Sequence, residues 1–443
     1  MQKNNVFAWS LVVALGGFLF GFDTAVISGA EKSIQTYWSL NVFEHGLTVS
    51  IALIGTVFGA LLGAFPSDKL GRKKTLYIIA ALYLFSALGT ALATNWSVFL
   101  VFRFLGGLGV GISSVTAPIY ISEIAPARSR GRLVGLFQFN IVFGILIAFL
   151  SNYLIGQTGE QSWRWMLGVQ AFPSILFYVL LFFVPESPRW LILHRNNKDE
   201  AIKVLQKINP IGYQQDYDAI VTHNAPIQQN TSNEKLLVKK YRLPITLAVL
   251  FAVFNQVSGI NAIIYYAPRI FEMAGLGAHT SLLSSVGIGL VNFTFTLLAI
   301  SFIDKIGRRT LMLIGSLGLI LSLSLVSYTF FTGNFGGYHI TVYLMLYIAF
   351  FAFSQGAVIW VFISEIFPNE VRAKGQTLGS FTHWVVAALI AFSFPYFAEN
   401  LGGGNTFLFF SAMMVLQLLF VWKLMPETKG KSLEQIEKTM MGH

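Results

Sequence analysis

"DKLGRKKTL" (Asp68–Leu76) and "DKIGRRTL" (Asp304–Leu311) are two copies of one short motif, and their first residues lie 236 positions apart. Each copy combines an acid, a glycine and a group of basic residues, and each lies between two long apolar segments. Two further motif pairs recur at nearly the same spacing: "SEIAPARSRGR" (Ser122–Arg132) with "SEIFPNEVRAKG" (Ser364–Gly375), and "PESPRW" (Pro185–Trp190) with "PETKGKS" (Pro426–Ser432). Three motif pairs at one spacing indicate two halves of an internal repeat.

The composition predicts that both halves span a membrane. Of the 443 residues, 55% are hydrophobic and 11% are charged, whereas about a quarter of a soluble domain is charged. A bilayer core about 30 Å thick needs about 20 apolar residues in a helix that rises about 1.5 Å per residue. We expect twelve spans, at about residues 6–30, 47–66, 76–94, 97–121, 132–154, 165–184, 244–267, 280–303, 310–331, 341–364, 375–398 and 405–424. The first run is too long for a signal-peptide core and is read as a retained span.

The basic residues predict the orientation. If both termini are cytoplasmic, all but four of the 30 Lys and Arg residues fall in cytoplasmic segments. The exceptions are Arg103 inside a span, and Lys32, Arg164 and Arg269 outside. This bias follows the positive-inside rule, so we expect a multi-pass protein of the inner membrane with both termini in the cytoplasm. The net charge of +10 then reflects orientation and contact with anionic lipid, and nucleic-acid binding is not expected.

Several chemistries are excluded by residue type. The chain has no cysteine, which excludes disulfides, thiol catalysis and thiolate metal sites. The seven histidines are scattered, and no nucleophile–base pair or metal-ligand spacing is found. We therefore expect a protein that is not an enzyme and needs no metal and no cofactor.

The repeat predicts the domain organisation. We expect an all-α integral membrane protein with a six-helix bundle at residues 1–185, a cytoplasmic linker at 186–243, a second six-helix bundle at 244–426 and a cytoplasmic tail at 427–443. The linker segment "NKDEAIKVLQKINP" (Asn197–Pro210) spaces apolar residues as an amphipathic helix does. Two pseudo-symmetric bundles with a site between them are typical of transporters that work by alternating access, and they disfavour a channel.

The repeated motifs place acids beside basic residues at the predicted cytoplasmic helix ends. Glu123 and Arg130 are seven positions apart, as are Glu365 and Arg372, and each glutamate is also within reach of a basic residue in the GRK or GRR turn. We hypothesise that such pairs form a cytoplasmic gate that ties the halves together and breaks when the protein faces inward. The alternative is a set of loop charges without mutual contact. The predicted gate residues are Asp68, Arg72, Glu123, Arg130, Glu186, Arg189, Asp304, Arg308, Glu365, Arg372 and Glu427.

Taken together, the motifs resemble those of the sugar porters of the major facilitator superfamily. The resemblance covers nearly the whole chain and includes "PESPRW", "PETKGKSLEQIE", "RFLGGLGVG" (Arg103–Gly111) and "NQVSGINAIIYYAP" (Asn255–Pro268). It implies the major facilitator fold and a central sugar site built mainly by the second half. The implied sugar-binding residues are Gln138, Asn255, Gln256, Asn261, Asn292, Gly356, Trp360, His383 and Trp384, and the implied outer gate is Tyr265 and Tyr266.

The chemistry of these residue types suits a sugar. Carboxamides offer a donor and an acceptor from one planar group, as sugar hydroxyls require, and an indole can cover the apolar face of a sugar ring. The alternative is that some of these amides only bond neighbouring helices, and that the tyrosines are plain interfacial residues.

Three departures from the family pattern leave the sugar open. The family commonly has two glutamines where this chain has Asn255–Gln256, and Asn or Gln where it has His383. A xylose-type member has Gln at the position of Ile145. We expect a neutral hexose or pentose such as glucose, galactose or xylose.

The stretch "GGFLFGFDTAVISGA" (Gly16–Ala30) places Asp23 inside an apolar span, and Arg103 lies inside the fourth span. Ionisable residues within a membrane are rare and usually functional. In proton-coupled members of the family the equivalent pair couples transport to protons, which implies that Asp23 and Arg103 do so here. Burial favours the protonated acid, while a nearby guanidinium favours the carboxylate. The small residues around Asp23 are expected to let the fourth span approach closely.

The sequence therefore predicts a monomeric secondary active transporter that imports a monosaccharide with a proton. Two alternatives stay open. In the first, Asp23 and Arg103 form a static pair in a uniporter. In the second, the protein is a non-transporting sugar sensor, a class that typically carries longer cytoplasmic tails than the one seen here.

Overall fold

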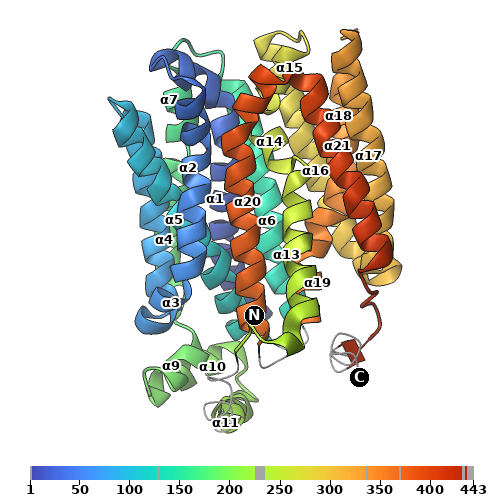
Figure 1. Ribbon diagram of the computed structural model, residues 1–443. Helices are drawn as coiled ribbons and strands as arrows, with labels where there is room; N and C mark the ends of the chain where they lie inside the picture. The colour runs from blue at the N-terminus through green and yellow to red at the C-terminus, as the bar shows by residue number, and fades with distance from the viewer. Residues whose placement is uncertain are drawn as a thin grey trace. The chain divides into compact units, whose positions relative to one another are not determined.

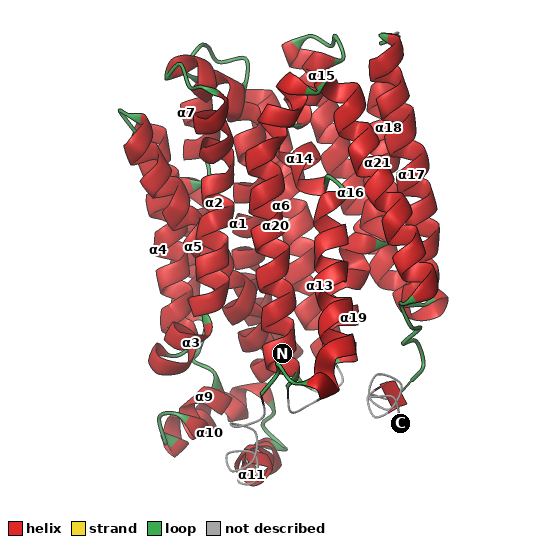
Figure 2. Ribbon diagram, in the orientation of Figure 1, coloured by secondary structure: helices red, strands yellow, loops and turns green. Residues whose placement is uncertain are grey.

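The computed structural model describes residues 2–126, 129–224, 235–335, 338–368, 371–431 and 435–436, with side chains from Asn5 onward. Within these ranges the regular structure is helical and contains no strand (Figure 2). The gaps include Arg128, part of the linker and most of the tail, so the predictions for those residues lie outside the described part of the chain.

Twelve helical segments in the described residues are long and apolar enough to cross a membrane, which confirms the predicted number of spans (Figure 1). The first six are α1 (Gln2–Tyr37), α2 (Val42–Leu62), α4 (Arg72–Leu92), α5 (Trp96–Ile124), α6 (Arg130–Ile155), and α7 (Ser162–Gly168) continued by α8 (Ala171–Leu180). The other six are α13 (Arg242–Val257) with α14 (Ile260–Tyr265), α16 (Ala278–Ile306), α17 (Arg308–Thr332), α18 (His339–Phe353) with α19 (Gln355–Ile366), α20 (Arg372–Asn400) and α21 (Gly402–Lys423).

Shorter helices connect these spans. α3 (Ala64–Leu70) precedes α4, and α15 (Ala267–Met273) follows α14. The linker contains α9 (Pro188–Leu193), α10 (Lys198–Ile208) and α11 (Tyr213–Asn224), which lie beyond one end of the long helices α4 and α5 (Figure 1). Ala201 and Val204 on one face of α10 pack against Trp190 and Leu191 of α9, so α10 is amphipathic as its sequence predicts.

The chain forms two compact units. The first consists of Met1–Asp23, Gly55–Ile145 and Leu167–Glu234, and the second of Thr24–Ile54, Leu146–Met166 and Lys235–His443. The units therefore do not follow the repeat, because the end of α1 beyond Asp23, the first part of α2 and the end of α6 pack with helices of the second half.

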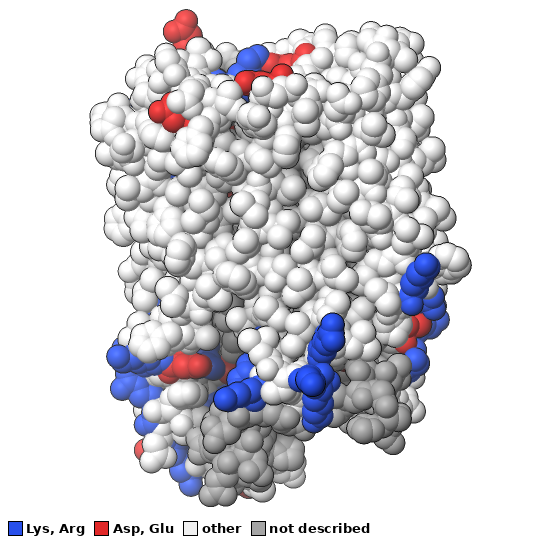
Figure 3. Space-filling model, viewed as in Figure 1, with Lys and Arg blue, Asp and Glu red and all other residues white. Residues whose placement is uncertain are grey.

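Charged side chains are concentrated near the helix ends. On the face shown in Figure 3 the middle of the helices is uncharged, and Lys and Arg gather near one end. Such a band is what a hydrocarbon core requires.

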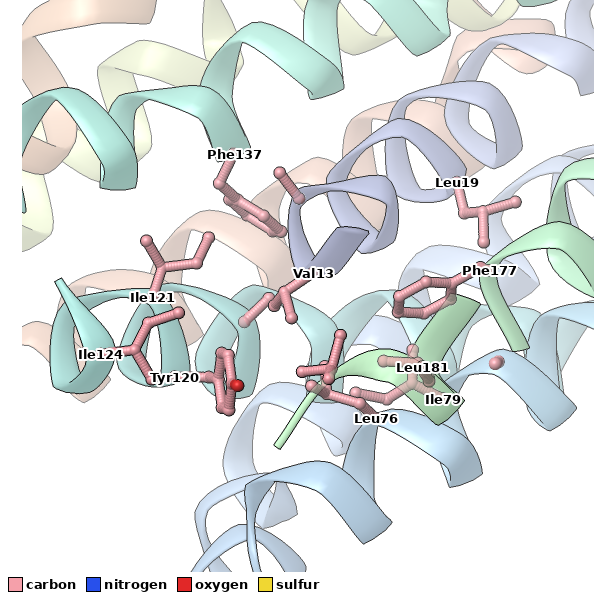
Figure 4. Close-up of a cluster of buried hydrophobic side chains, with 14 of the residues drawn as sticks. Val13, Leu19, Leu76, Ile79, Tyr120, Ile121, Ile124, Phe137, Phe177 and Leu181 are labelled. Carbon is pink, nitrogen blue, oxygen red and sulfur yellow. The ribbon is translucent and has the colours of Figure 1, made fainter. Parts of the chain in front are cut away.

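The core of the first unit consists of apolar side chains from α1, α4, α5, α6 and α8 (Figure 4). Val13 and Leu19 of α1 lie among Leu76 and Ile79 of α4 and Phe177 of α8, and all five are fully buried. This cluster fixes α1 within the unit and thereby fixes the position of Asp23.

Glycines of α1 allow neighbouring helices to pack closely, mostly α6 rather than the fourth span. A Cβ on Gly21 would lie 1.9 Å from the carbonyl oxygen of Ile141, and one on Gly17 would lie 2.7 Å from that of Phe137. Only Gly16 meets α5, where a Cβ would lie 2.8 Å from Ser113 Oγ. The expectation that these small residues let the fourth span approach is therefore wrong for most of this stretch. The sequence shows that α1 has a face of small residues, but it does not show which neighbouring helix packs against that face.

The Gly21→Ala variant is predicted to be less stable than the unmodified protein by several degrees in melting temperature, because the added methyl group forces α1 and α6 apart. Gly135→Ala on α6 is the matched control, since a Cβ there meets nothing within 4 Å and alanine is the better helix former by about 1 kcal/mol. Thermal unfolding in detergent, followed by tryptophan fluorescence, measures both. Equal melting temperatures for the two variants would contradict the close approach.

Candidate functional site

A buried ion pair joins α1 and α5 in the first unit. Arg103 Nη1 lies 2.9 Å from Asp23 Oδ1, and Arg103 Nη2 lies 3.5 Å from the backbone oxygen of Asp23. Asp23 is 2% exposed and Arg103 is 1% exposed. The structure thus brings together the two ionisable residues that the sequence places inside spans.

Buried polar groups at this ion pair are left without hydrogen bonds in the described part of the chain. Arg103 Nε and the hydroxyl of Tyr83 are buried and have no hydrogen-bond partner among the described residues. Gly106 leaves room for the carboxylate, since a Cβ there would lie 3.4 Å from Asp23 Oδ1 and 2.4 Å from Ser86 Oγ. In such surroundings a charge left without its partner is costly, so each residue of the pair depends on the other.

The candidate sugar-binding amides of the second unit lie around a break between α13 and α14. Gly259 separates these helices with a φ of +89°, a conformation that favours glycine. A Cβ there would also lie 2.6 Å from the ring of Phe410. The break places Asn255 and Gln256 at the end of one helix and Asn261 at the start of the next.

These amides form one hydrogen-bonded chain. Asn261 Nδ2 donates to Gln256 Oε1 at 2.6 Å, and Gln256 Nε2 donates to Asn255 Oδ1 at 2.9 Å. Asn255 Nδ2 in turn lies 3.4 Å from the carbonyl oxygen of Gln355. Gln256 Nε2 is also 3.3 Å from the ring nitrogens of His383. A neutral imidazole has one acceptor nitrogen, so only one of these two contacts can be a hydrogen bond donated by the amide.

Aromatic rings continue this surface. The His383 ring lies between Trp360 of α19 and Trp384 of α20, with centroid distances of 4.9 Å and 4.8 Å. His383 and Trp384 are buried, whereas Trp360 is 37% exposed and presents an indole that is free to cover an apolar ring face. Gly356 stands one helical turn before Trp360 on α19.

The other predicted site residues are placed as follows. Asn292 of α16 is buried within the second unit. Tyr265 and Tyr266 are buried, and Tyr266 donates to the carbonyl oxygen of Ala391 at 2.9 Å. Gln138 is half-buried on α6 and belongs to the first unit, so the structure does not place it against the amides of the second.

Sequence reasoning missed a second amide network. Gln355 Nε2 donates to Gln417 Oε1 at 2.7 Å, and Gln417 Nε2 donates to Ser316 Oγ at 2.9 Å, all within the second unit. Gln355 begins α19 directly after a break at Ser354. The available signal was a glutamine inside each of two apolar spans. This network supports the backbone oxygen that Asn255 uses.

At the predicted cytoplasmic end of the first unit, the acids of the three motifs converge on the start of α4. Arg72 binds Glu123 with both Nε and Nη2, at 3.1 and 3.0 Å, and its Nη1 lies 3.0 Å from Asp68. Glu186 accepts the backbone N–H groups of Arg72 and Lys73 at 3.0 and 3.1 Å. Burial raises the pKa of Glu186, although these hydrogen bonds favour its carboxylate.

The second unit repeats this arrangement at the start of α17. Arg308 lies 2.8 Å from both Asp304 and Glu365, and Glu427 accepts the backbone N–H groups of Arg308 and Arg309 at 2.9 and 3.0 Å. Gly71 and Gly307, the residues before the two arginines, have φ values of +99° and +102°. The repeat in sequence is therefore also a repeat in side-chain contacts.

The spacing of seven residues is not the pairing that the structure shows. Among the described residues, neither Glu123 nor Glu365 forms an ion pair with the arginine seven positions later. Arg372 instead donates to the carbonyl oxygen of Phe367 at 3.2 Å, and Arg130 lies at the start of α6. Both glutamates use the arginine of the GRK or GRR turn, because that turn brings a rigid guanidinium to the carboxylate.

Comparison with known proteins agrees with this arrangement. Residues 9–440 match the family model described as sugar (and other) transporter. The chain is 36% identical to the D-xylose-proton symporter of Escherichia coli (strain K12) over 98% of this chain and 96% of that one. It is 37% identical to the arabinose-proton symporter of Bacillus subtilis (strain 168) over 97% and 94% of the two chains.

Among solved structures, the inward open conformation of the xylose transporter from E. coli matches with a TM-score of 0.87 and 34% identity, over 98% of this chain and all of the other. The match of the family model across nearly the whole chain, together with these identities, shows that the chain belongs to the sugar transporter family of the major facilitator superfamily.

Proposed function

We propose that this protein imports a monosaccharide together with a proton by alternating access. The observation that carries the proposal is the buried Asp23–Arg103 pair. The names of its relatives, which include xylose-proton and arabinose-proton symporters, support the proposal. We further propose an inner-membrane location with both termini in the cytoplasm, and a monomeric state.

The coupling follows from the charges. Arg103 keeps its proton, so any proton that the pair takes up goes to Asp23. When Asp23 is ionised, the pair holds α1 against α5, and protonation releases the guanidinium. If the contact forms in some conformations and not in others, proton affinity and conformation become linked, and sugar import is driven by proton entry.

The available energy is sufficient for accumulation. One proton crossing about 150 mV releases about 3.5 kcal/mol, at about 2.3 kcal/mol per 100 mV. Since each 1.4 kcal/mol corresponds to a factor of ten, this sustains a sugar gradient of roughly 300-fold.

Asp23→Asn is predicted to abolish accumulation against a gradient while sugar exchange continues, because the amide cannot carry a proton. Uptake of labelled sugar into energised vesicles measures accumulation, and counterflow in de-energised vesicles measures exchange and shows that the variant is folded. Accumulation that survives in Asp23→Asn would show that the pair is structural and that the protein is a uniporter.

The sugar is proposed to bind the amide chain Asn255–Gln256–Asn261, with the Trp360 indole against its ring. Gln138, Asn292, Gly356, His383 and Trp384 are proposed to complete the site. His383 sets this chain apart from the usual family pattern, and its ring lies 3.3 Å from the amide nitrogen of Gln256. Competition between glucose, galactose, xylose, arabinose and fructose for one labelled sugar identifies the substrate.

Gln256→Leu is predicted to weaken sugar binding by about tenfold or more, since a lost hydrogen bond to a polar ligand costs about 1–3 kcal/mol when groups are left unpaired. Asn140→Leu is the matched control, because Asn140 is a buried amide that bonds its own helix at Leu136. Calorimetric titration of purified protein measures both. A comparable loss in the two variants would place the effect on folding rather than on the site.

We also propose that the Arg72–Glu123 and Arg308–Glu365 clusters belong to the cytoplasmic gate, together with Asp68, Arg130, Glu186, Arg189, Asp304, Arg372 and Glu427. The outer gate is proposed to include Tyr265 and Tyr266.

Each glutamate binds an arginine of its own half in this structure, and the proposed gate requires the same glutamates to pair across the halves when the protein faces outward. The double variant Glu123→Gln/Glu365→Gln is therefore predicted to favour the inward-facing state. A single cysteine in the inner cavity, labelled by maleimide in inside-out vesicles, measures the change in this cysteine-free chain. An unchanged labelling rate would contradict the proposed gate.

A further inference from the structure

A buried charge cluster lies at the predicted extracellular ends of α1, α2 and α15, all within the second unit. Its centre is Glu31 of α1, which is 1% exposed. Glu31 Oε2 lies 2.5 Å from Nε2 of His45 on α2, and Glu31 Oε1 accepts from Nε of Arg269 on α15 at 3.0 Å. Arg269 Nη2 also donates to Gln35 Oε1, one turn after Glu31. Both carboxylate oxygens are thus used, each by a different helix.

The surroundings of His45 bring a fourth helix into the cluster. The His45 ring is fully buried and meets the Tyr266 ring edge to face at 5.8 Å, and Tyr266 donates to the backbone of α20 at Ala391. The next residue after His45 is Gly46, where a Cβ would lie 2.3 Å from the carbonyl oxygen of Phe392 on α20. Since His45 Nδ1 has no partner among the described residues, the ring contacts the carboxylate of Glu31 through Nε2 alone.

This cluster joins the two halves of the repeat. α1 and α2 belong to the first half of the sequence, whereas α15 and α20 belong to the second. Alternating access moves one half against the other about a central site, so an outward opening has to separate Glu31 and His45 from Arg269. A buried carboxylate satisfied from both sides fixes one closed geometry, because any partial opening leaves a charge unpaired.

We propose that Glu31, His45 and Arg269 form an extracellular clasp that holds the outer end closed and sets how often it opens. The inference rests on the proposed alternating access and adds these residues to the outer gate. Nothing in the sequence motifs singles out Glu31, His45 or Arg269.

The chain supplies its own matched control. Lys32 and Glu272 form a second ion pair between the same two helices, α1 and α15, but Lys32 is largely exposed, with 61% of its side chain open to solvent. An exposed pair gains little from its charges in water. Removing the buried pair should therefore make the outer end open more often, whereas removing the exposed pair should leave the frequency of opening unchanged.

The test uses the absence of cysteine from the sequence. Ser28 is buried on α1, one turn before Glu31, and Ser28→Cys is a near-isosteric reporter. Because the side chain is buried in this structure, we expect a membrane-impermeant maleimide added outside to label Ser28→Cys only when the outer end opens. Glu31→Gln and Arg269→Gln are each expected to raise the labelling rate at least about tenfold, the factor that corresponds to about 1.4 kcal/mol. Lys32→Gln and Glu272→Gln are expected to leave it within about twofold.

A double-variant cycle separates a clasp from general loosening. If Glu31 and Arg269 act as one pair, the Glu31→Gln/Arg269→Gln protein labels no faster than the faster single variant. The proposal is overturned if the increases in labelling rate of the two single variants multiply in the double variant. It is also overturned if the single variants label at the rate of the Ser28→Cys protein.

A third set of variants tests the role of His45. His45→Gln keeps a donor for Glu31 and is expected to label more slowly than His45→Leu. Equal rates in these two variants would remove His45 from the clasp.

Sugar counterflow in the same Ser28→Cys background separates this inference from the proposed function. If counterflow persists and the clasp variants have the same labelling rate as the Ser28→Cys protein, the clasp is rejected and the proposed transport is not. Absence of counterflow in the Ser28→Cys protein itself, with sugar binding intact, rejects transport by alternating access.

Discussion

The buried ion pair between Asp23 and Arg103 is the constraint on which the rest of the structure depends. Two opposite charges inside an apolar bundle are tolerated only together, and at 2.9 Å with both residues almost fully buried they satisfy that condition. The pair needs α1 and α5 in close register, and the packing of Val13 and Leu19 into the core of the first unit provides it. A purely structural contact between α1 and α5 could be made by apolar residues without the cost of burying two charges. The proposed coupling depends on the presence of a titratable acid at this position.

The residues proposed for proton coupling and those proposed for sugar binding belong to different units. Asp23 and Arg103 belong to the first, whereas the amide chain from Asn255 to Asn261 and the indole of Trp360 belong to the second. Proton and sugar therefore need not touch for one to drive the other. In the proposed mechanism their linkage is conformational, and each ligand has only to favour the same change of state. The breaks at Gly259 and Ser354 show how the second unit builds a polar surface inside apolar spans, because each break turns side chains of two helix ends toward one region.

The sequence predicted the parts of the structure that leave a periodic or repeated signal. Twelve apolar runs gave the twelve spans, the rarity of charge within them singled out Asp23 and Arg103, and the family resemblance implied that these two residues are partners. It failed where the answer depends on which side chains face each other across helices. The spacing of Glu123 and Arg130 suggested a pair, but the turn at Gly71 delivers Arg72 instead. Gly17 and Gly21 proved to serve α6, and Gln355 and Gln417 meet although 62 residues separate them. Glu31, His45 and Arg269 lie in no motif, so only the packing of α1, α2 and α15 brings them together.

The reversal point of net sugar flux tests the central claim, that proton and sugar cross together, most directly. In proteoliposomes with a pH difference of one unit and no membrane potential, one proton per sugar supplies about 1.4 kcal/mol. Net flux of labelled sugar should therefore stop when the sugar is about tenfold more concentrated on the alkaline side. Flux that stops at equal sugar concentrations, whatever the pH difference, would contradict the account and identify a uniporter.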